Sequence, residues 1–98
     1  SALQPEKFRL ENNYPNPFNP ETTIEFSVPE QSEVIFKIYN ILGEEMYQMQ
    51  DENLSSGVYH VRWNGVNKFG VQVPSGIYFY QLKAGDSFVQ TKKMTLLK

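Results

Sequence analysis

Residues 22–39 have the sequence TTIEFSVPEQSEVIFKIY, and this stretch decides the class of fold. Pro29 divides it into two runs, each with an apolar side chain at every second position. The alternating apolar residues are Ile24, Phe26 and Val28 in the first run and Val34, Phe36 and Ile38 in the second. Such alternation is typical of β-strands that bury one face, and a proline ends a strand. The stretch therefore predicts two successive strands.

Residues 44–50 form a further predicted strand after a turn at Gly43. The period of this run is unclear, because two pairs of side chains compete for its inner face: Met46 with Gln48, and Tyr47 with Met49. We therefore allow a β-bulge in it. Residues 51–57 are polar and are expected to form a loop.

Three more strands are predicted towards the C-terminus. Residues 59–63 alternate between apolar and polar side chains. Residues 77–82 are apolar on both faces, which suits a central strand covered on both sides. The glycine and aspartate at 85–86 are expected to close a tight hairpin into a last strand over 88–97.

About seven short strands separated by turn signals, without a helical stripe, predict an all-β fold. The fold class is a single immunoglobulin-like antiparallel β-sandwich. Its expected core consists of large apolar residues on the inner faces: Ile24, Phe26, Phe36, Ile38, Trp63, Tyr78 and Tyr80. An aromatic stripe could instead form a sugar-stacking platform, but rings at alternate positions of neighbouring strands are more often core. This stripe consists of Tyr59, Trp63, Tyr78, Phe79 and Tyr80.

An N-terminal strap rich in Pro and Asn precedes the first strand. Its prolines and rings are Tyr14, Pro15, Pro17, Phe18 and Pro20. Prolines fix the backbone in an extended form and remove hydrogen-bond donors, so the strap is stiff but is no central strand. We expect Tyr14 and Phe18 to press it against the sandwich. Recognition of the strap by a receptor is the alternative.

The chain has 98 residues and a mass of 11.4 kDa, which is one domain's worth. We expect residues 1–12 to be a linker or cloning remnant and residues 13–98 to be the domain. Because there is no cysteine, disulfides and thiolate metal sites are excluded. A net charge of −2 gives no field that attracts nucleic acid, and no apolar run is long enough to span a membrane.

Candidate chemistry is sparse. The single histidine, His60, lies in a strand, and a general base there would need a carboxylate and a nucleophile across the sheet. The only aspartates are Asp51 and Asp86, so we expect no catalytic residues. Residues 64–70 carry oxygen-bearing side chains between glycines, but no carboxylate. Calcium usually requires Asp or Glu, so turn chemistry is the favoured interpretation of this loop over a metal site.

The final strand carries Lys92, Lys93 and Met94. Two lysines are too few for a nucleic-acid patch, and lysine on an edge strand deters pairing between sheets. We expect Met94 to be buried and the backbone edge to remain open. A partner could add a strand to such an edge.

Several motifs together resemble a known family. They are NYPNPFNPETTIEFSV at 13–28, IYNILG at 38–43, WNG at 63–65, SGIYFY at 75–80 and TKKM at 91–94. In this order they are similar to the type A C-terminal sorting domains of bacterial type IX secretion substrates. The portion from 63 to 80 also resembles, more weakly, the immunoglobulin-like domain of flagellar hook-capping proteins.

The resemblance implies a non-catalytic sorting and surface-anchoring module of a larger exported protein, without a cofactor. Its partners would be an upstream cargo domain, the outer-membrane secretion machinery and a sortase-like peptidase. The implied location is the surface or exterior of a Gram-negative bacterium. With it, Lys92, Lys93 and Met94 become the expected recognition residues. The alternative is a structural spacer, or an adhesive or carbohydrate-binding sandwich, appended to an extracellular enzyme.

Overall fold

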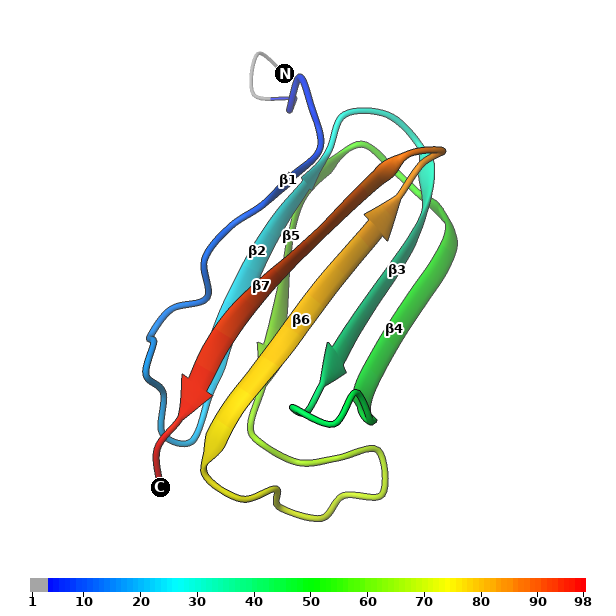
Figure 1. Cartoon of the computed structure of the whole chain (residues 1–98). Coiled ribbons are helices and arrows are strands. Elements are labelled where there is room, and N and C mark those ends of the chain that lie inside the picture. The colour runs from blue at the N-terminus through cyan, green and yellow to red at the C-terminus, as the bar shows by residue number, and fades with distance from the viewer. Residues whose placement is uncertain (1–3) are drawn as a thin grey trace.

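The computed structural model describes residues 4–98, and within them every regular element is a β-strand (Figure 1). The seven strands are β1 (Arg9–Leu10), β2 (Thr22–Val28), β3 (Ser32–Tyr39), β4 (Glu45–Leu54), β5 (Gly57–Trp63), β6 (Gly76–Ala84) and β7 (Phe88–Leu96). They form a three-stranded sheet in the order β1-β2-β5 and a four-stranded sheet in the order β4-β3-β6-β7. All pairings within the sheets are antiparallel. The predicted immunoglobulin-like sandwich is confirmed.

The core lies between the two sheets and is built from the alternating residues of each strand. The seven residues expected in the core are all buried there. Phe36 is its centre, with its ring stacked on Phe26 of the opposite sheet and tilted against Tyr80 of its own sheet. Trp63 packs edge-on against Tyr78. The aromatic residues at 63, 78 and 80 are therefore core and not a surface platform for sugars.

Strand β4 is longer than predicted, and the structure shows which of its side chains face the core. Tyr47 and Met49 lie opposite Ile38 and Phe36 of β3, so they belong to the inner face. A register shift follows at Ile38/Tyr39, in agreement with the allowed bulge. The expected loop at 51–57 is wrong except at Ser55 and Ser56, because 51–54 belong to β4 and Gly57 begins β5. Residues 51–54 continue the strand because β4 is an edge strand whose exposed end needs no apolar alternation.

Strand β6 is central in its sheet, between β3 and β7, as expected. The expectation that both its faces are covered is wrong. Tyr78, Tyr80 and Leu82 are buried, whereas Ile77 on the opposite face is exposed and Phe79 is half-buried. The described residues form two layers only, so nothing in them covers the outer face of this sheet (Figure 1).

The turns use glycine where the backbone is left-handed. Gly43 has a φ of 81° and Gly65 a φ of 74°, and a β-carbon on Gly65 would also lie 3.3 Å from Leu96 Cδ2. Two tyrosine hydroxyls fasten loops to the strands that follow them. Tyr59 donates to the Ser55 carbonyl at 2.6 Å, and Tyr78 donates to the Pro74 carbonyl at 2.6 Å.

The N-terminal boundary of the domain lies earlier than expected. β1 pairs with β2, Leu10 is buried, and Phe8 stacks on Phe88 with ring centroids 5.5 Å apart. Residues 8–12 therefore belong to the sandwich and not to a linker, because they add a strand to an edge of β2 that would otherwise be unpaired. The remainder of the expected linker includes residues 1–3, which lie outside the described residues.

The two ends of the described chain lie at opposite poles of an elongated body with extents of 40 × 22 × 20 Å (Figure 1). The loops β2–β3, β4–β5 and β6–β7 lie at the N-terminal pole. The loops β3–β4 and β5–β6 lie at the other pole, together with the C-terminus (Figure 1).

Candidate functional site

The strap is fastened to the sandwich by the hydroxyl of Tyr80. This hydroxyl donates to the Glu11 carbonyl at 2.8 Å and accepts the Asn13 backbone N–H at 2.9 Å. The ring belongs to the core, and burial raises the pKa of Tyr80 to about 12. A core residue of β6 thus holds a backbone segment nearly seventy residues earlier in the chain.

A small polar network shapes the strap behind this attachment. The buried Asn13 side chain donates to the Pro15 carbonyl at 3.2 Å and to Thr22 Oγ1 at 3.0 Å. The Thr22 hydroxyl in turn donates to the Pro15 carbonyl at 2.9 Å. These bonds replace the ladder that prolines cannot form.

Phe18 is the apolar anchor of the strap. It is 1% exposed, and its ring lies 5.8 Å from that of Trp63. Its backbone pairs with β7: Phe18 N–H donates to the Thr95 carbonyl at 2.9 Å, and Leu97 N–H donates to the Phe18 carbonyl at 3.0 Å. Pro15, Pro17 and Pro20 are exposed, so they act through the backbone and not through packing.

The expectation that Tyr14 also presses on the sandwich is wrong, since its side chain is 81% exposed. Tyr14 and Thr23 exchange two backbone hydrogen bonds of 2.9 Å, so their side chains share one face of the sheet. Thr23 lies on the outer face, opposite to Ile24. The pairing therefore turns the Tyr14 ring outward.

The residues expected for recognition on β7 have three different environments. Lys93 is exposed, Lys92 is half-buried and donates to Asn12 Oδ1 at 3.2 Å, and Met94 is fully buried in the core. A partner can therefore contact the Lys93 side chain directly, whereas the Met94 side chain packs in the core and is not accessible to a partner.

The backbone edge of β7 is closed at its C-terminal end only, so the expectation of an open edge is wrong there and holds for the rest of the strand. The strap occupies its C-terminal part through Phe18, and Asn16 Oδ1 accepts the Thr95 N–H at 3.1 Å. In an antiparallel strand the backbone N–H and C=O groups of every second residue point to the same neighbour. The backbone groups of Val89, Thr91 and Lys93 therefore point away from β6 and remain available for a partner strand. The sequence could not show this, because the strap and β7 are about eighty residues apart.

His60 is exposed and lies 3.1 Å from Glu25 Oε1 across the β2–β5 pair. Within residues 4–98, no group of three or more His, Asp or Glu side chains could hold a metal ion. In the 64–70 loop, Asn67 Oδ1 accepts the N–H groups of Phe69 and Val71, in agreement with turn chemistry.

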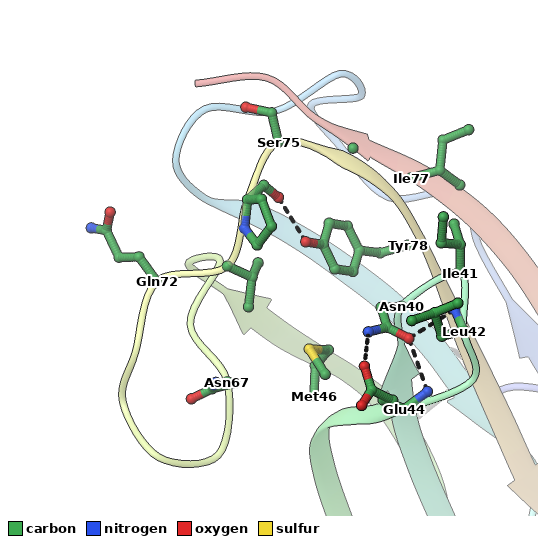
Figure 2. Close-up of a pocket in the computed structure, with 13 residues that line it drawn as sticks. Asn40, Ile41, Leu42, Glu44, Met46, Asn67, Gln72, Ser75, Ile77 and Tyr78 are labelled. Carbon is green, nitrogen blue, oxygen red and sulfur yellow. Dashed lines mark hydrogen bonds between the residues drawn. The ribbon is translucent and has the colours of Figure 1, made fainter.

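An apolar cleft at the C-terminal pole is the feature that sequence reasoning missed (Figure 2). Its volume is about 490 Å³, and Ile41 and Leu42 lie on one side of it, across from the loop that carries Asn67 and Gln72. Asn40 holds the β3–β4 turn by accepting the N–H groups of Leu42 and Glu44, both at 2.9 Å. This turn geometry keeps both aliphatic side chains in water.

We call this end of the molecule the apolar pole. It comprises the cleft and five exposed apolar side chains of the adjoining loops and of β6: Ile41, Leu42, Phe69, Val71 and Ile77. Leu42 and Phe69 are each 79% exposed and Ile41 is 70% exposed. The signal available in the sequence was the presence of large apolar residues within turn segments, where polar residues are usual.

Exposed apolar side chains on a folded domain mark a site of interaction with another molecule. The fold and the apolar pole therefore indicate a recognition module. The family model described as "Secretion system C-terminal sorting domain" matches residues 12–96. The chain belongs to this family, whose members direct the export of type IX secretion substrates and are not catalytic. Membership of this family implies export to the cell surface or the exterior.

Solved structures support the fold. Dimeric latent PorU from Porphyromonas gingivalis matches 93% of this chain and 9% of its own, with a TM-score of 0.71 and 18% identity. PorZ, a surface component of the type IX secretion system of the same organism, matches 100% of this chain and 12% of its own, with a TM-score of 0.60 and 23% identity. FlgD from P. aeruginosa matches 76% of this chain and 61% of its own, with a TM-score of 0.59 and 19% identity.

The chain thus spans about a tenth of the length of the two P. gingivalis proteins. A search of curated proteins gave no match. No helix among the described residues is long and apolar enough to cross a membrane.

Proposed function

We propose that this domain brings a larger exported protein to the outer-membrane secretion machinery by docking through the apolar pole. The observation that carries the proposal is that three exposed apolar side chains, Ile41, Leu42 and Ile77, line a cleft of about 490 Å³. Contiguous exposed apolar surface of this kind marks interaction sites on soluble proteins. A partner that inserts an apolar side chain into the cleft removes this surface from water, at about 25 cal/mol per Å².

The position of the pole supports the same proposal. The chain enters the domain at the opposite end of a body 40 Å long. A cargo domain that precedes this chain therefore lies far from the pole and leaves it accessible.

The β7 edge provides a second contact in this proposal. Lys93 supplies an exposed ammonium group beside the unpaired backbone positions, and Lys92 holds the strap through Asn12. Backbone pairing gives affinity, and the positions of the lysines select the partner. Met94 keeps this strand seated on the core.

We further propose that catalysis belongs to the cargo, and that a sortase-like peptidase removes this domain after export. The family resemblance supports removal. Mass spectrometry of the mature surface protein tests it: a product that lacks this domain is expected, and retention of the intact domain would contradict it.

The docking test uses a periplasmic reporter that carries this chain at its C-terminus, in a host with type IX secretion. Leu42→Glu places a charge in the cleft rim, and the reporter is expected to remain in the periplasm. Val58→Glu is the matched control, because Val58 is 48% exposed on the other sheet and should leave export unchanged. Export of the Leu42→Glu reporter at the wild-type level would contradict docking through the pole.

Lys93→Ala is tested in the same reporter for the second contact. A several-fold fall in export is expected, and Lys83→Ala, an exposed lysine on β6, is the control. Equal export of both variants would remove the edge from the proposal.

A further inference from the structure

The outer face of the three-stranded sheet holds a second hollow, which shares no lining residue with the cleft at the apolar pole. Its volume is about 430 Å³, and it is lined by Glu11, Asn12, Tyr14, Thr23, Glu25 and His60. Apart from the ring of Tyr14, these side chains are polar. A hollow of this composition is built for hydrogen bonding.

The backbone fixes the walls of the hollow. Glu11 N–H donates to the Glu25 carbonyl at 2.9 Å, and Glu25 lies opposite His60 in the β2–β5 register. One step along the sheet, Tyr14 exchanges two backbone bonds with Thr23. Residues from three adjacent backbone segments therefore project from the same face in two rows.

The phenol ring of Tyr14 is the unusual element of this site. A ring that is 81% exposed buries almost no apolar surface within the domain, although its backbone is held by two hydrogen bonds of 2.9 Å. A rigidly presented, exposed ring offers a flat apolar surface at the rim of a polar hollow.

The hollow offers both hydrogen-bond acceptors and donors. Glu11 and Glu25 supply carboxylate oxygens, and Thr23 and His60 supply a hydroxyl and an imidazole. Glu25 uses one oxygen for His60 at 3.1 Å, which leaves the other for a ligand. A ligand that fits such a site carries closely spaced hydroxyl groups and one apolar face.

We propose that this hollow binds a neutral saccharide, with a pyranose ring stacked on Tyr14 and its hydroxyl groups bonded to Glu25 and His60. A cationic peptide is the competing occupant, because two glutamates line the hollow. Two cations offset these glutamates: Arg62, the register partner of Thr23, lies on the same face, and Lys92 donates to Asn12, which lines the hollow. This proposal does not depend on docking through the apolar pole.

The test is a titration of the ¹⁵N-labelled 98-residue chain with maltotetraose, mannotetraose and chitotriose at millimolar concentrations, followed by amide chemical shifts. At least one saccharide is expected to shift the amides of Tyr14, Thr23, Glu25 and His60. Tyr14→Ala is expected to abolish these shifts. Phe69→Ala is the matched control, because Phe69 is 79% exposed at the pole, and it should bind as the wild type does.

Two further variants sharpen the result. Tyr14→Phe keeps the ring and should keep binding, which separates stacking from a change in folding. Glu25→Gln should weaken binding about tenfold, as expected for the loss of a hydrogen bond to a charged group. The proposal is overturned if no saccharide shifts these amides, if the shifts persist in Tyr14→Ala, or if tetralysine produces them at lower concentration than the saccharides.

Discussion

Two side chains, Phe18 and Tyr80, attach the strap to the sandwich by different physical means. Phe18 removes a ring from water next to Trp63, and Tyr80 saturates two backbone groups with one hydroxyl. The nearby Tyr14 does neither, although it belongs to the same sequence motif. Both rings in this motif are large and apolar, so their types alone could not show which one is buried.

Phe18→Ala is expected to destabilise the domain by about 3–5 kcal/mol, since it empties a fully buried site. For a domain of this size the melting temperature should fall by roughly 12 °C or more. Tyr14→Ala serves as the control and should change the free energy of unfolding by about 0.5 kcal/mol at most. Thermal unfolding followed by circular dichroism measures both, and equal melting temperatures for the two variants would contradict the assigned anchor.

Tyr80 makes stability depend on alkaline pH. Burial raises its pKa from 10.0 to about 12, and burial raises the pKa of Tyr78 as well. The unfolded phenol loses its proton near pH 10, whereas the folded one keeps it to about pH 12. The contribution of Tyr80 is therefore complete below pH 10 and is lost as the pH rises towards 12.

Urea unfolding of the wild type and of Tyr80→Phe across pH 8–12 tests this dependence. At pH 8 the variant should be less stable by about 1–3 kcal/mol, because the Glu11 carbonyl and the Asn13 N–H lose their shared partner. Between pH 10 and 12 the gap should narrow, since the variant has no phenol to ionise at this site. A difference in the free energy of unfolding that stays constant across this pH range would contradict the raised pKa of Tyr80.

At the scale of elements, the strap serves as a short parallel strand for β7. It covers the Thr95 and Leu97 amides and leaves those of Val89, Thr91 and Lys93 without a backbone partner. The protection of β7 amides from hydrogen exchange should therefore change along the strand. A uniform edge strand would show no such division.

Hydrogen exchange measures this division directly. Thr95 and Leu97 amides should exchange slowly, and those of Val89, Thr91 and Lys93 quickly. Asn16→Ala removes the acceptor of the Thr95 N–H and should accelerate exchange at Thr95, while exchange at Leu97 remains slow. If Thr95 exchanged as fast as Lys93 in the wild type, the strap would not be seated on β7.

Sequence patterns predicted the elements that bury one face and missed those that do not. β2, β3 and β5 alternate clearly, so their positions followed from the period alone. The end of β4 is exposed on both faces and β1 has only two residues, so neither carries a period. The closed C-terminal end of the β7 edge and the apolar pole depend on segments distant in sequence, and no local pattern contains that information.

In the proposed function, the whole molecule separates attachment to the cargo from docking along its long axis. The N-terminal end of the described chain lies at one pole, and the cleft lies at the other, beside the C-terminus, where Lys98 N–H donates to Ser75 Oγ at 2.9 Å. Ser75 itself lines the cleft. Bulk added at the C-terminus therefore lies close to the proposed docking surface.

Reporter fusions test this polarity. A folded reporter placed before residue 4 should be exported, whereas the same reporter placed after Lys98 should obstruct the pole and remain in the periplasm. A flexible linker of increasing length after Lys98 should restore export gradually. Equal export of both fusions at the shortest linker would contradict docking at this end.

The pairing of Phe18 with the Thr95 and Leu97 backbone joins the first part of the domain to the last. A polypeptide whose synthesis stops before Thr95 has no surface on which the strap can close, and its core lacks Met94 and Leu96. The sorting domain can therefore reach its complete fold only in translation products that extend through residue 97.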